Sequence, residues 1–77
     1  MKFDDKEFLA NRIKYHRKKM NLTQAELAEK VDLSDQHISR IESGKYTPTI
    51  EVLTKLATAL DMDLEIRFVE KKQTTEE

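Results

Sequence analysis

Apolar residues recur at intervals of three and four positions over the first 60 residues of the chain, which is the spacing of one face of an α-helix. The first helix is expected from about Asp5 to Met20, because acidic residues gather near its start and basic residues near its end. Its buried stripe is expected to contain Leu9, Ile13 and Met20, with Phe8 beside it. The pattern therefore predicts a chain that begins with one amphipathic helix.

Three shorter helices are predicted to follow, each opened by a hydroxyl residue that can cap it. Thr23 and Glu26 have the spacing of a capping box, in which each side chain bonds the backbone amide of the other. Ser34 is the expected cap of the third helix, which ends just before Gly44, and Thr49 is the expected cap of the fourth. The expected inner-face residues are Leu27, Ala28 and Val31, then Ile38 and Ile41, then Ile50, Leu53, Leu56, Ala57 and Leu60.

The period changes in LEIRFV, residues 64–69, where apolar and polar residues alternate as in a half-buried strand. A lone strand leaves unpaired backbone groups, so its simplest partner is the same strand of a second copy across a two-fold axis. The expected dimerisation residues are Leu64, Ile66 and Phe68. A continuing helix is the alternative, because short apolar runs are ambiguous. Residues 70–77 are polar and are expected to form a flexible tail.

These elements predict an all-α bundle with one short C-terminal strand, in a single domain over residues 1–69. With one glycine and one proline among 77 residues, helix is favoured nearly throughout. A domain of this size often gains stability from oligomerisation, so a homodimer is expected. The chain has no cysteine and its two histidines lie far apart, so neither a metal nor any other cofactor is expected. It also lacks an apolar run long enough for a membrane span and an N-terminal signal sequence, so no membrane partner and a cytoplasmic location are expected.

The pair of short helices between Thr23 and Ser43 is joined by Val31-Asp32-Leu33, which is helix-turn-helix spacing. In such a unit the first helix fixes the docking angle on DNA and the second presents its N-terminal side chains to base edges. The same pair can also occur in an all-α domain simply because it packs well. Spacing alone therefore leaves both a DNA-binding unit and a purely structural one open.

The stretch LTQAELAEKVDLSDQHISRIESGKYTPTIEVLTKLATAL closely resembles the Cro/repressor (Xre) helix-turn-helix family. The resemblance extends from Arg12 to about Leu60 and implies a lambda-repressor-like bundle of four to five helices. It also implies a transcriptional regulator, most simply a repressor, that binds a double-stranded DNA operator as a dimer on an inverted repeat. At the turn, Asp32 stands where the family usually has glycine, and aspartate tolerates the left-handed conformation better than most residues.

The resemblance also assigns roles to individual residues. Arg17 and Glu42 match family positions that form a partly buried ion pair. The implied base-contacting residues, all in the helix over about 35–43, are Asp35, Gln36, His37, Ser39 and Arg40. The implied phosphate-contacting residues are Arg17, Thr23, Gln24, Ser43 and Lys45. Three alternatives stay open: Asp35 also suits the dipole at the start of its helix, Arg40 also suits a surface ion pair, and Lys45 also suits a solvated loop.

Charge is unevenly distributed along a chain whose formal net charge is −1. Residues 1–22 carry seven basic and three acidic groups, whereas residues 23–77 carry seven basic and twelve acidic groups. Phosphate contacts can also come from backbone amides, which do not enter a charge count. The acidic total therefore argues against strong non-specific DNA binding and leaves specific binding open.

A second class of function is a protein-binding role, because ALDMDLEIRFVEKK resembles the C-terminal part of HigA-type antitoxins. That resemblance implies a toxin protein as a possible partner, together with autoregulation of the operon. The chain departs from the pattern in having few residues before its first helix. An enzyme is not expected, since no nucleophile paired with a base and no glycine-rich phosphate loop is present.

Overall fold

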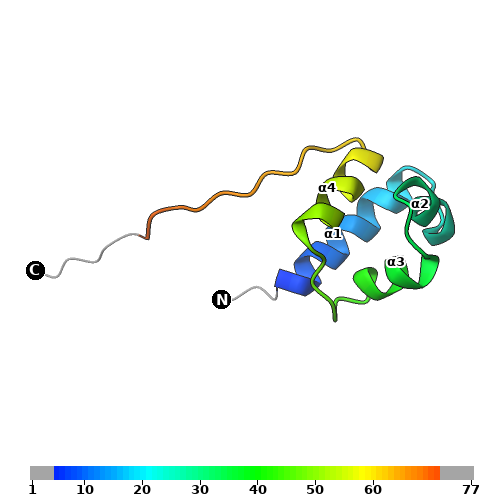
Figure 1. The fold of residues 1–77 in the computed structure, drawn as a ribbon, viewed down its shortest axis with the longest axis horizontal. Coiled ribbons are helices and arrows are strands. Elements are labelled where there is room, and N and C mark those ends of the chain that lie inside the picture. Colours follow the sequence, from blue (N-terminus) through cyan, green and yellow to red (C-terminus); the bar gives the residue numbers. More distant parts are fainter. Residues whose placement is uncertain (1–4, 72–77) are drawn as a thin grey trace, which may run out of the picture.

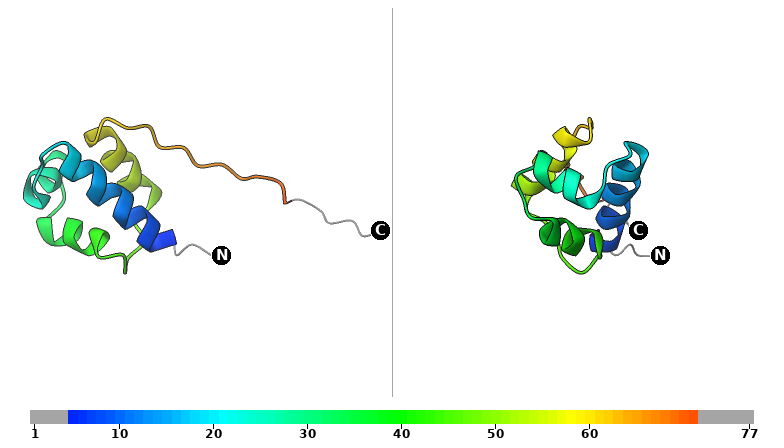
Figure 2. Two further views of the ribbon diagram at one scale, coloured as in Figure 1. Left: turned by 180° about the vertical axis from the view of Figure 1, so that it is seen from behind. Right: turned by 90° about the vertical axis from the view of Figure 1, so that its right-hand side faces the viewer.

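The computed structural model describes residues 5–71 and contains four helices, α1 (Asp5–Lys19), α2 (Gln24–Lys30), α3 (Asp35–Glu42) and α4 (Ile50–Ala59). They form one small bundle from which the C-terminal segment extends (Figure 1). Helices α2 and α3 lie at the end of the bundle opposite that segment, as the reverse view in Figure 2 also shows. The predicted all-α fold is confirmed. None of the helices within the described range has the length and hydrophobicity that crossing a bilayer requires.

The three short helices begin at the predicted hydroxyl caps. The hydroxyl oxygens of Thr23, Ser34 and Thr49 accept hydrogen bonds from the backbone amides three residues later, at 3.0, 3.0 and 3.2 Å. At α2 the Glu26 carboxylate also accepts a bond from the backbone amide of Thr23, at 2.8 Å, which completes the predicted capping box. These bonds satisfy amides that a helix start would otherwise leave unpaired.

Three helices end in a left-handed residue that is not glycine. Asn21, Asp32 and Asp61 have φ angles of 58°, 59° and 59°. In each case the next backbone amide bonds a carbonyl five residues earlier, as in the Leu33 amide to Ala28 carbonyl bond of 2.9 Å. Gly44, with φ of 81°, has the equivalent place after α3. Asparagine and aspartate thus adopt the left-handed conformation that glycine usually provides. The chain has only one glycine.

The left-handed turn at Asp32 leads to a testable prediction. Asp32→Gly is expected to raise the free energy of unfolding by about 0.5–1 kcal/mol, since glycine has no Cβ to strain at positive φ. A glycine placed in a helix interior, as in Glu29→Gly, is expected to lower the free energy of unfolding by about 1 kcal/mol. Urea denaturation measures both variants. Losses of equal size at the two positions would contradict the account of the turn.

The core confirms the expected inner faces of α2 and α3. Its fully buried large side chains are Leu27, Ile38, Ile41 and Leu56. The predicted faces of α1 and α4 need correction, because Met20, Phe8 and Ile50 are 43%, 49% and 62% exposed. The other buried core residues are Ala10, Ile13, Ala28, Val31 and Leu60.

The buried stripe of α1 is Ala10, Ile13 and Arg17, so Ile13 is the one predicted stripe residue that is buried. Ala10 is small, and a Cβ placed on Gly44 would lie 3.8 Å from the Ala10 Cβ. Two small residues therefore allow the loop after α3 to approach α1 closely. Met20 leaves the stripe because α1 ends one residue earlier and the chain turns there.

Residues 63–71 contain neither strand nor helix in the single chain, so the strand predicted over residues 64–69 is not formed there without a second copy. The segment is extended and points away from the bundle (Figure 1). A strand requires a hydrogen-bonding neighbour, and residues 5–71 of one chain offer none to this segment. The alternative of a continuing helix is wrong, because α4 ends at Ala59. The predicted flexible tail lies outside the described residues from residue 72 onwards.

Candidate nucleic-acid interface

Helices α2 and α3 form a compact unit around a four-residue connection. Leu27 of α2 and Ile38 of α3 have no exposed surface, so the two helices are held together by core packing. The left-handed Asp32 reverses the chain, and the Ser34 cap starts α3 directly afterwards. This geometry fixes the angle between the helices and leaves one face of α3 uncovered.

The exposed face of α3 carries four of the five expected base-contacting residues. Ile38, Ile41 and Glu42 are buried on the opposite face. Polar side chains at the start and middle of an exposed helix can reach base edges in a major groove. The four exposed residues are Asp35, Gln36, Ser39 and Arg40.

His37 lies differently from these four. Its side chain is half-buried, and its ring meets that of Tyr46 edge to face, with centroids 5.6 Å apart and planes 70° apart. Tyr46 itself packs against the core. The contact places His37 at the edge of the exposed face, beside the loop after α3. Sequence reasoning missed this role of Tyr46, because nothing in the spacing connects the two rings.

Arg17 and Glu42 form a buried ion pair between α1 and α3. The Arg17 Nε and Nη2 groups donate to the two Glu42 carboxylate oxygens at 2.7 and 3.0 Å. Arg17 Nη1 donates to the Leu22 carbonyl at 2.7 Å. The hydrogen bond to Glu42 raises the pKa of the Arg17 guanidinium above its ordinary value, although burial opposes the shift. The Arg17 guanidinium therefore stays charged over the ordinary pH range.

Gln24 joins this network from α2. Its Nε2 group donates to Glu42 Oε1 at 3.0 Å, so one carboxylate links three helices. No sequence signal indicated this bond, because the two residues are 18 positions apart and the amide was expected only to face DNA. The bond holds the Gln24 side chain at the start of α2, next to α3.

The other residues expected to contact phosphates differ in exposure and in whether a donor group remains free for a phosphate. Lys45 is exposed in the loop after α3, and Thr23 is exposed at the start of α2. Ser43 donates its hydroxyl hydrogen to the Arg40 carbonyl at 2.6 Å, so that donor is already used within the loop. Arg17 is 8% exposed and engaged by Glu42, which leaves it little surface for a phosphate.

The family model HTH_3, described as helix-turn-helix, matches residues 13–66 of this chain. That range includes the whole of α2, α3 and α4. The chain belongs to the helix-turn-helix family. This helix-turn-helix protein is 39% identical over 61 residues to an HTH-type transcriptional regulator from Methanocaldococcus jannaschii, with 79% of this chain and 92% of that protein covered. It is 40% identical over 60 residues to the CTXphi transcriptional repressor RstR from Vibrio cholerae, with 78% and 50% covered.

Solved structures of helix-turn-helix regulators have the same fold. The clp gene regulator ClgR from Corynebacterium glutamicum aligns with a TM-score of 0.73 at 28% identity, over 75% of this chain and 62% of that one. An HTH_3 family transcriptional regulator from Vibrio cholerae aligns with a TM-score of 0.71 at 33% identity, over 75% of this chain and 33% of that one. The chain thus spans less than two thirds of either solved regulator.

Family and relatives together identify a DNA-binding regulator of transcription and point away from an enzyme. Across residues 5–71, no group of histidine, aspartate and glutamate side chains is arranged to hold a metal ion.

Proposed function

We propose that the protein is a dimeric repressor that places α3 in the major groove of an operator containing an inverted repeat. The observation that carries the proposal is the division of α3 into two faces. One face is anchored by Ile38, Ile41 and Glu42, and the other exposes side chains that can bond base edges. A recognition helix needs both, because base readout requires a rigid support.

The exposed face suits specific base contacts. The side-chain amide of Gln36 has one donor and one acceptor group that can both bond adenine. The planar guanidinium of Arg40 can donate two hydrogen bonds to guanine. Asp35 either accepts a bond from a cytosine amino group or favours the positive start of α3 through its charge. Ser39 lies between Gln36 and Arg40 and can bond several bases, whereas His37 contributes at the edge of the surface.

Phosphate contacts would come from the flanks of α3. Lys45 follows it in the loop, and Thr23 and Gln24 begin α2, where the helix dipole favours an anion. The last turn of α1 adds Lys18 and Lys19, which are exposed. With an overall net charge of −1, non-specific binding should be weak, so specificity depends on the α3 contacts.

A homodimer would place two copies of α3 on one side of the duplex, with half-sites roughly 34 Å apart. The repressor RstR, among the relatives, supports repression as the outcome. Binding of chromosomal DNA would place the protein in the cytoplasm. A toxin-binding role stays a prediction from the C-terminal sequence, since the relatives named above are regulators and a repressor.

The phosphate contacts predict a change in salt dependence. Lys45→Ala should weaken binding to all DNA sequences alike, and should reduce the slope of log affinity against log salt by about two for a dimer. Lys55→Ala is the matched control, because Lys55 is an exposed lysine on α4 and not on the α2–α3 unit. Fluorescence anisotropy at several salt concentrations measures both slopes. Identical slopes for the two variants would remove Lys45 from the interface.

A further inference from the structure

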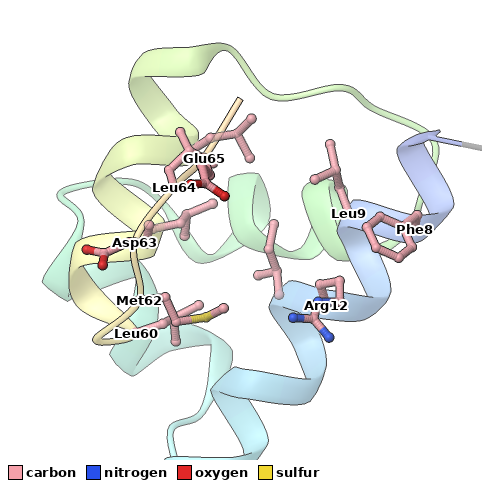
Figure 3. Close-up of a pocket in the computed structure, with 12 residues that line it drawn as sticks. Phe8, Leu9, Arg12, Leu60, Met62, Asp63, Leu64 and Glu65 are labelled. Atoms are coloured by element: carbon pink, nitrogen blue, oxygen red, sulfur yellow. The ribbon is translucent and has the colours of Figure 1, made fainter. Parts of the chain in front are cut away.

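An apolar groove lies between α1 and α4, with a volume of about 280 Å³. Figure 3 shows Phe8, Leu9 and Arg12 on the α1 side and Leu60, Met62 and Leu64 on the other side. A liquid water molecule occupies only about 30 Å³, so an aromatic side chain fits this space. Apolar walls of this kind gain stability when another apolar group replaces water against them.

The extended segment directly after the groove carries the apolar groups that suit it. Leu64 already lines the groove, while Ile66 is 54% exposed and Phe68 is fully exposed. Residues 64–71 contain no glycine, proline, asparagine, aspartate or serine, the residues that favour tight turns. Phe68 therefore has no local route back to the groove of its own chain, and the natural occupant is a second copy.

We propose that two copies pair their C-terminal segments as antiparallel strands centred on Ile66, and that Phe68 of each copy fills the α1–α4 groove of the other. The inference rests on the dimer of the proposed function and specifies its interface. The pairing supplies each segment with the backbone partner that a single chain lacks. A two-fold axis uses the same surface twice, so both grooves are filled.

Charge selects the register of this pairing. With Ile66 at the axis, Glu65 of each copy lies opposite Arg67 of the other, and opposite charges across a strand pair are stabilising. A centre at Glu65 would place two carboxylates opposite each other, and a centre at Arg67 would place two guanidiniums opposite each other. Both of those registers are disfavoured. The sequence thus favours the centre at Ile66.

The same register brings Phe68 to the groove. Residues equally far from the axis face each other, so Phe68 of one copy lies opposite Leu64 of the other, and Leu64 lines the groove. Glu70 lies on the same face as Phe68, since side chains alternate along a strand. Arg12, which also lines the groove, offers a guanidinium to that carboxylate. The apolar and charged groups of segment and groove are therefore complementary.

Charge reversal tests the register. In sedimentation equilibrium of the full chain, Glu65→Lys and Arg67→Glu should each raise the dimer dissociation constant about tenfold, since two attractive pairs become repulsive. An equimolar mixture of the two variants should regain the wild-type constant, because each reversed charge then faces its opposite in the other chain. A mixture as weak as the separate variants would overturn the register.

Removal of the aromatic ring tests the groove. Phe68→Ala should raise the dissociation constant roughly a hundredfold, because two buried rings are lost per dimer. Val69→Ala, at a residue 75% exposed and on the opposite face of the segment, should change it less than about twofold. Equal effects of the two variants would overturn the seating of Phe68. The bundle should keep its stability, since a single chain buries none of this ring.

Operator titration of the same samples separates this inference from the proposed function. Suppose that the wild-type protein prefers an operator, but the mixture of the two charge-reversal variants does not regain the wild-type dissociation constant. The register would then be overturned, and the repressor function would stand. Recovery of the dimer by the mixture, without preference for any operator, would support the interface and overturn the repressor.

Discussion

Glu42→Ala is expected to lower the free energy of unfolding by about 3–5 kcal/mol, the cost of breaking a buried ion pair from one side. The Arg17 side chain is 9% exposed and that of Glu42 is 1% exposed, so little water can replace the lost carboxylate. The variant would leave the Arg17 guanidinium without its partner and remove the acceptor of the Gln24 amide. A loss of this size is comparable to the whole stability of many small domains.

Urea denaturation with circular dichroism measures this effect. Glu29→Ala serves as the matched control, because Glu29 is exposed on α2 and its loss should cost less than about 0.5 kcal/mol. The double variant Arg17→Met with Glu42→Leu should recover most of the stability, since apolar side chains of similar size can replace a buried pair. A Glu42→Ala protein as stable as the Glu29→Ala control would contradict the structural role of the pair.

Arg40→Ala is expected to abolish discrimination at one base pair of each half-site, at a cost of about 1–3 kcal/mol per copy and twice that for a dimer. Arg40 is exposed on α3, where its guanidinium can reach a guanine edge. Anisotropy titrations should compare the operator with one that carries a symmetric change at that base pair. The variant should bind the two duplexes alike, whereas the wild-type protein should prefer the first.

Two comparisons sharpen this test. Gln36→Ala should relax a different base pair, because the two residues lie about one helical turn apart on the same face. Lys45→Ala should weaken both duplexes equally, as expected for a phosphate contact. If Arg40→Ala lost affinity equally for matched and changed operators, Arg40 would be a phosphate contact or part of a surface ion pair, and not a base reader.

Much of the fold could be predicted because local signals determine it. The hydroxyl caps at Thr23, Ser34 and Thr49 lie where their spacing to the apolar residues placed them. The left-handed turn at Asp32 follows from the tolerance of aspartate for positive φ. The inner faces of α2 and α3 follow from their apolar spacing. In each case the controlling interaction spans only a few residues.

The errors arose where distant parts of the chain decide the outcome. Met20 was expected in the core, but the buried stripe of α1 faces α3 through Ala10 and Arg17. A charged residue such as Arg17 does not indicate a core position until its ion-pair partner is known. The strand at Leu64, Ile66 and Phe68 depends on a partner that a single chain does not contain. Likewise, the bond between Gln24 and Glu42 appears only when α2 and α3 are packed.

The most direct test of the repressor is its preference for DNA sequence. A fluorescence-anisotropy titration at physiological salt should compare the duplex immediately upstream of the protein's own gene with a shuffled duplex of equal composition. We expect binding to the native duplex with two chains per site, tighter than to the shuffled duplex by about a thousandfold or more. Equal and weak binding to both duplexes would contradict the assignment of this DNA as the operator read by α3.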